Sequence, residues 1–108
     1  MTVDFTAYAG DTLNVVVRLF DELGAPWNIE GLDATYIIHD ESANETLVTK
    51  TSVDDEIESV GNEVRIYLAA GDTNTLRGTY YHELRLVDTD GQVSTVLTGH
   101  ISLDGTVL

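Results

Sequence analysis

Cysteine is absent from this sequence of 108 residues, and proline occurs only once, at Pro26. Without cysteine the chain has no disulfides, no thiolate metal sites and no cysteine nucleophile. No apolar run approaches the roughly 20 residues that a membrane-spanning helix needs. The first residues lack the basic and apolar regions of a signal peptide, so none is expected. We therefore expect one domain, residues 1–108, that is held together by packing and hydrogen bonds alone.

Positive charge is also scarce. Lys50 is the only lysine, and the five basic residues face 19 acidic ones, which gives a formal net charge of −14 at pH 7. Nucleic acids and anionic membranes attract basic surfaces, so neither is an expected partner. Two interpretations of the acidity stay open. It keeps the protein soluble, or it is an adaptation to molar salt, where charges are screened within about 3 Å.

The sequence is rich in short alternating segments separated by turn residues, which is the pattern of an all-β domain. Residues 69–76 predict a short helical turn across one end, residues 54–58 an acidic solvated segment, and Asp88–Gly91 a hairpin turn. The predicted fold is an immunoglobulin-like antiparallel β-sandwich of about seven strands. The expected strands are 3–6, 12–20, 34–40, 45–50 (an edge), 63–68, 80–87 and 92–103, with Val93 among the inward residues of the last.

The most specific fold signal is the segment Arg77-Gly78-Thr79-Tyr80, which leads directly into an alternating strand. A turn that ends Gly-x-Tyr and opens a strand is typical of the tyrosine corner of a β-sandwich. In that motif the tyrosine packs inward and its hydroxyl bonds to backbone a few residues upstream. Tyr80 is therefore the predicted corner.

Residues that could carry chemistry do not form a convincing site. His82 is expected to point inward and His39 and His100 outward, so they are not expected to share a metal ion. The segment Asp88-x-Asp90-Gly91 opens like a calcium loop, but a strand follows in place of the remaining oxygen ligands. Carboxylates fall in turns and on outer faces, and nucleophile elbows and phosphate loops are absent. We expect no catalytic residues, metal or cofactor, and hence no enzyme.

Apolar residues on outward faces are the main indication of a contact role, because grouped apolar residues rimmed by charge mark protein interfaces. One such set is expected on each sheet. Trp27 has two interpretations: a loop side chain folded over one end of the core, or an exposed anchor for a partner. The candidate interface residues are Val16, Phe20 and Tyr67 on one sheet, Ile37, Tyr81 and Val96 on the other, and Trp27.

The order of these signals resembles a known family. It runs through Gly10-Asp11-Thr12, residues 21–24, 27–32 and 34–35, residues 68–73 and 76–84, Asp88-Thr89-Asp90-Gly91 and residues 97–101. This order resembles the immunoglobulin-like domain at the N-terminus of upper baseplate proteins of tailed phages, and small stand-alone virion proteins built on the same domain.

The resemblance implies a non-catalytic structural protein of the virion that contacts other capsid or tail proteins and copies of itself. Because the chain stops at Leu108 without a receptor-binding or coiled-coil extension, a decoration or adaptor role is expected rather than a baseplate fibre. Together with the acidity, the resemblance implies a tailed virus of a halophilic archaeon. The alternative is a module that binds carbohydrate or the host surface, with Trp27, Tyr67 or Tyr81 as a platform for sugar rings.

Overall fold

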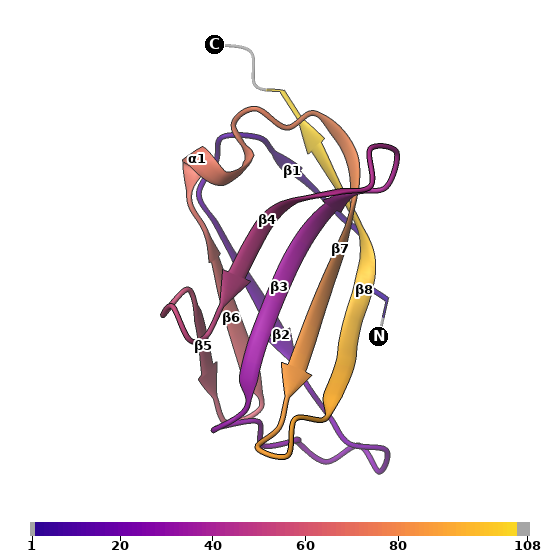
Figure 1. Cartoon of the computed structure of the whole chain (residues 1–108). Coiled ribbons are helices and arrows are strands. Elements are labelled where there is room, and N and C mark those ends of the chain that lie inside the picture. Colours follow the sequence, from indigo (N-terminus) through magenta and orange to yellow (C-terminus); the bar gives the residue numbers. More distant parts are fainter. Residues whose placement is uncertain (1, 106–108) are drawn as a thin grey trace.

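The computed structural model describes residues 2–105, and two β-sheets packed face to face form its framework (Figure 1). Sheet A has the strand order β1-β8-β7-β3-β4, and sheet B, behind it in the figure, has the order β2-β6-β5. No helix in the described part of the chain is long and apolar enough to cross a membrane. The elements are β1 (Phe5–Tyr8), β2 (Leu13–Arg18), β3 (Asp33–Asp40), β4 (Glu45–Thr51), β5 (Ile57–Val60), β6 (Glu63–Leu68), α1 (Ala70–Thr73), β7 (Gly78–Val87) and β8 (Val93–Asp104).

The predicted all-β, immunoglobulin-like sandwich is confirmed. Strands β2-β6-β5 occupy the places of immunoglobulin strands B-E-D, and β8-β7-β3-β4 those of G-F-C-C′. Two details differ from the prediction. Residues 2–105 form eight strands, and β1 pairs in parallel with β8, so sheet A is mixed rather than purely antiparallel.

The core lies between the inward faces of the two sheets, where side chains alternate in and out along each strand. In β2 and β6 the inward residues are aligned, for example Val15 with Ile66 and Val17 with Val64. Sheet A contributes Tyr36, which is fully buried. The other hydrophobic residues that are 2% exposed or less are Ile29, Ala34, Ile38, Leu68, Leu84, Leu86, Leu97, Ile101 and Leu103, together with Val64 and Ile66.

The predicted tyrosine corner is present at Tyr80. Its hydroxyl donates a hydrogen bond to the Arg77 carbonyl oxygen (2.8 Å) and accepts one from the Arg77 N–H (3.0 Å). Gly78 lies between them with a φ of +107°, a conformation that a residue with a side chain rarely adopts. The glycine thus allows the turn that places Tyr80 at the start of β7.

The inward residue His82 fixes the N-terminal segment to the rest of sheet A. Its Nε2 lies 2.6 Å from the Val3 carbonyl oxygen, and its Nδ1 lies 2.9 Å from the Tyr36 hydroxyl. A carbonyl oxygen can only accept, so Nε2 carries the proton and Nδ1 accepts from the tyrosine. Burial lowers the pKa of His82, because the charged form would lose its hydration. The imidazole is therefore a neutral link between β7, β3 and the N-terminal segment.

Lys50 closes the space between the sheets at the β4 and β5 edge. It is aligned with the inward residue Tyr36, and its Nζ lies 2.9 Å from Asp72 Oδ2 and 3.2 Å from Glu56 Oε2. Desolvation opposes the charged amine, but the hydrogen bonds to Asp72 and Glu56 outweigh it and raise the pKa of Lys50. Asp72 also accepts a hydrogen bond from the Ala69 N–H (2.7 Å). The lysine thus ties the edge strand to α1.

Three local predictions are corrected. Residues 54–58 include the start of β5, where Ile57 is buried in the core rather than solvated. Val96 is the extra residue of a β-bulge opposite Leu84 and Arg85, and it packs against the core instead of lining the outer surface of sheet A. Val93 was expected to point inward but is 60% exposed, because the bulge shifts the alternation of side chains at this end of β8.

Candidate protein-contact surfaces

The outer face of sheet B brings two of the predicted interface residues together. Asn14 is aligned with Tyr67, and Val16 with Arg65, so Val16 and Tyr67 are diagonal neighbours. Val16 is 48% exposed and Tyr67 is 50% exposed. Phe20, 54% exposed, follows β2 and pairs in an isolated bridge with Pro26. The alternation along β2 places it on the same outer face, farther from Tyr67.

Two arginines share one glutamate beside Val16 and Tyr67. Glu63 Oε1 lies 2.9 Å from Arg18 Nε, and Glu63 Oε2 lies 2.9 Å from a terminal nitrogen of Arg65. Hydrogen bonds from Arg65 and then Arg18 lower the pKa of Glu63, which stays ionised. Two of the chain's five basic residues therefore lie on this one face. Here a partner meets apolar side chains beside two guanidinium groups that share one carboxylate.

A shallow polar hollow of about 180 Å³ adjoins Tyr67. Its walls carry an amide, a guanidinium and several carboxylates beside the aromatic ring. Glu56, which belongs to this wall, is also the partner of Lys50. The lining residues are Asn14, Asp55, Glu56, Glu58, Arg65 and Tyr67.

On the outer face of sheet A, Tyr81 lies between two histidines. The strand register aligns His39, Tyr81 and His100 across β3, β7 and β8. The rings of Tyr81 and His100 meet edge to face, with centroids 6.2 Å apart. His100 Nε2 reaches Glu41 Oε1 (2.8 Å). The Tyr81 hydroxyl donates to Glu83 Oε1 (2.8 Å).

Glu83 is an unusual residue on this face, because it occupies an outward position of β7 and yet the residue is only 8% exposed. One oxygen accepts from Tyr81, and the other forms an ion pair with the Arg85 guanidinium. Burial and then the bond to Glu83 raise the pKa of Tyr81. Ile37, aligned with Glu83 on β3, is partly buried. The polar groups of Tyr81 and Glu83 are thus engaged with each other or with a neighbour on the same strand.

The structure supports the first interpretation of Trp27, a loop side chain that packs on the core rather than an exposed anchor. It is partly buried and packs against the core, with its backbone N–H bonded to the Leu19 carbonyl (3.1 Å). The sequence analysis missed Leu23, which is 95% exposed in the turn after β2. Asp21 Oδ1 accepts from the Leu23 and Ala25 N–H groups in that turn (2.9 Å each). The signal that could have identified this exposed residue is a leucine within the turn segment Asp-Glu-Leu-Gly.

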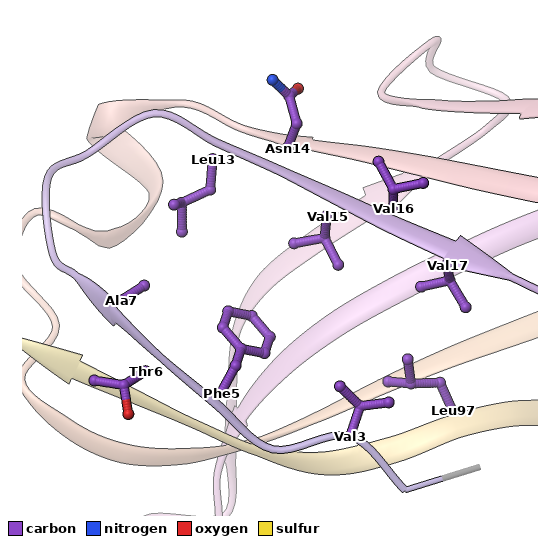
Figure 2. A pocket seen from close by; sticks show the side chains of 10 residues that line it. All are labelled: Val3, Phe5, Thr6, Ala7, Leu13, Asn14, Val15, Val16, Val17 and Leu97. Carbon is purple, nitrogen blue, oxygen red and sulfur yellow. The ribbon is translucent and has the colours of Figure 1, made fainter.

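The sequence analysis also missed an apolar groove of about 390 Å³ between β1 and β2. Figure 2 shows Phe5 pointing from β1 towards Leu13 and Val15 of β2, while Val16 points away. None of the ten described residues that line the groove is charged. The apolar walls are Val3, Phe5, Ala7, Leu13, Val15, Val17 and Leu97.

Within residues 2–105, no three or more histidine, aspartate or glutamate side chains come together in a way that could hold a metal ion. Comparison with known proteins adds no family to these observations: no protein-family model matches the chain, and no curated protein matches it.

Proposed function

We propose that this protein is a non-catalytic structural component of a tailed-virus particle, which decorates or bridges capsid or tail proteins through direct contacts. The observation that carries the contact role is the pair Val16 and Tyr67, half-exposed and adjacent on the outer face of sheet B. The virion part of the proposal is supported by the order of sequence signals described above.

Charge explains why this face suits a partner. A chain with a net charge of −14 repels copies of itself and other acidic proteins over most of its surface. On sheet B, Arg18 and Arg65 share the single carboxylate of Glu63 beside the two apolar residues, so this group of three side chains has a net positive charge. Bringing a second acidic protein to this face therefore costs less electrostatic energy than bringing it to the acidic turns.

The protein inventory of purified particles tests the virion proposal. Trypsin cleavage after Arg65, Arg77 and Arg85 releases the peptides 66–77 and 78–85, which mass spectrometry can identify. We expect both peptides in particles purified by density gradient at high salt. Their presence in infected cells combined with their absence from intact particles would overturn the proposal.

A paired substitution tests the contact face. Tyr67→Glu places a charge in the centre of the apolar pair, whereas Tyr8→Glu changes a tyrosine of similar exposure on β1 (56%). We expect Tyr67→Glu, but not Tyr8→Glu, to lose binding to particles that have been stripped of the native protein. Equal binding of the two variants would show that sheet B is not the contact face.

The hollow beside Tyr67 favours a second candidate function, the binding of a carbohydrate. An exposed aromatic ring next to amide, guanidinium and carboxylate groups offers both a stacking surface and hydrogen-bond partners for sugar hydroxyls. A glycan array with the native protein, Tyr67→Ala and Tyr8→Ala tests it. Binding that only Tyr67→Ala abolishes would support this function. An array without any signal would leave the protein-contact role in place.

A further inference from the structure

We propose that the free edge of β2 accepts an additional β-strand from a partner protein: an extended segment without acidic residues and with apolar side chains at alternate positions, which fills the groove between β1 and β2. This site uses the backbone edge of β2 and the inward side chains behind it, whereas the contact face of sheet B uses the outward side chains of Val16 and Tyr67. The proposal does not depend on the virion role, because it can be tested with the isolated protein.

The backbone of β2 is paired on one side only. Leu19 N–H donates to the Asn62 carbonyl (2.9 Å), in line with the β2–β6 register. Hydrogen-bonded pairs recur at every second residue of an antiparallel ladder, so the odd-numbered residues of β2 bond to β6. The N–H and C=O groups of Asn14, Val16 and Arg18 therefore point to the opposite side. β2 is the first strand of sheet B, so within residues 2–105 no strand pairs with that side.

The groove exists because the two sheets differ in width. Sheet A has five strands and sheet B has three. On the β1 side, Phe5 and Ala7 face inward without a strand of sheet B directly opposite them. A strand bonded to β2 would lie about 4.8 Å from it and would continue sheet B across the groove. Its inward side chains would then pack against Phe5 and Ala7, while its backbone would satisfy the free groups of β2.

At the opposite side of the sandwich, charged side chains protect the edge strands from pairing with another strand. There the inward-pointing Lys50 and its partners Asp72 and Glu56 fill the space between the β4 and β5 edges. Natural proteins block edge strands with such inward charges, because an open edge invites pairing with another chain. β2 has no such charge on its inward face, where its residues are Leu13, Val15 and Val17. Inward-pointing charge therefore blocks the edges of β4 and β5, whereas the edge of β2 lacks this protection.

Charge defines the chemistry of the added strand. The ten lining residues carry no charge, on a chain that has 19 acidic residues among 108. Burying an unpaired charge against these apolar walls would be costly, so the inward positions of the strand must be apolar. An acidic segment would also be repelled by the net charge of −14. β2 offers six residues for pairing and β1 only four, which favours addition to β2.

A displayed library of random nine-residue peptides tests the proposal against the whole native protein. We expect the selected peptides to alternate between apolar and polar residues and to lack acidic residues. The comparison variants are Val16→Pro and Val16→Thr. Proline removes the N–H in the middle of the free edge and leaves the bonds to β6 intact, whereas threonine keeps that N–H. We expect proline to weaken binding of the selected peptides about tenfold and threonine to leave it nearly unchanged.

Hydrogen exchange of the native protein gives a second readout that does not depend on how the proline variant folds. Without peptide, the amides of Asn14, Val16 and Arg18 should exchange faster than those of Val15 and Val17. A bound peptide should slow the first three. Selected peptides that do not alternate between apolar and polar residues would overturn the proposal, and so would bound peptides that leave the exchange of these three amides fast. The proposal would also be overturned if a small apolar probe bound in the groove but no peptide did. Self-association that protects the same amides would replace the foreign partner with a second copy.

Discussion

Gly99 is the residue where a single methyl group should do the most damage. An added Cβ would lie 2.0 Å from the Val3 carbonyl oxygen and 2.9 Å from Asp4 Oδ1. The first of these atoms is backbone, so Gly99→Ala must push the N-terminal segment away from β8. Three hydrogen bonds depend on this approach: Val3 N–H to Thr98 (2.9 Å), His82 to Val3 (2.6 Å) and His100 N–H to Asp4 (2.8 Å).

The expected cost follows from these contacts. Each lost hydrogen bond contributes about 0.5–1.5 kcal/mol, and a buried donor left without a partner costs about 1–3 kcal/mol. The buried donor here is His82 Nε2, whose side chain is completely excluded from solvent. We therefore expect Gly99→Ala to lower the free energy of unfolding by about 2–5 kcal/mol.

Urea unfolding at one fixed, high KCl concentration measures this loss as a shift of the midpoint at constant slope. Gly71→Ala is the matched control, because it lies in α1 and an added Cβ would meet nothing within 4 Å. It should stabilise the protein by about 0.5–1 kcal/mol, the gain expected for alanine over glycine in a helix. A loss of less than about 1 kcal/mol for Gly99→Ala would refute the close approach of the N-terminal segment.

Three further predictions concern the corner, pH and salt. Tyr80→Phe removes both hydrogen bonds to Arg77 and should cost about 1–2 kcal/mol in urea unfolding without altering the circular dichroism spectrum; an unchanged midpoint would mean that the corner adds no stability. Because burial lowers the pKa of His82, the unfolded chain takes up a proton first as the pH falls below about 6.5. The free energy of unfolding should then fall by up to about 1.4 kcal/mol per pH unit. The double variant His39→Gln/His100→Gln removes the other two histidines and should show the same pH dependence. The melting temperature should rise with KCl, chiefly below about 1 M, as screening reduces the repulsion among the acidic side chains; a flat curve would leave the acidity as a solubility feature only.

The sequence predicts the features whose signals are local. The Gly-x-Tyr corner at Tyr80 and the edge position of β4 follow from short segments, and the structure confirms both. The bulge at Val96 was not predicted, because its position depends on how β8 pairs with β7. β5 escaped detection because Glu58, between Ile57 and Ser59, gives a four-residue edge strand the composition of an acidic loop.

The candidate surfaces divide in the same way. Val16 and Tyr67 lie on strands whose alternation is clear, so their outward direction could be predicted, whereas their diagonal contact depends on the register between β2 and β6. The groove could not be predicted, because it arises where two edges of different sheets meet. The unequal widths of the sheets are a property of the whole topology and of no single segment.

The parallel pairing of β1 with β8 has a mechanical consequence. Phe5 is aligned with Ile101, and Tyr8 with Asp104, so the first and last strands run side by side in the same direction. A force that pulls the two ends of the domain apart slides one strand along the other. Their hydrogen bonds are then loaded together and must rupture almost at once, rather than opening one by one like a zipper. A domain connected in this way resists stretching along its long axis more strongly than its equilibrium stability alone would indicate.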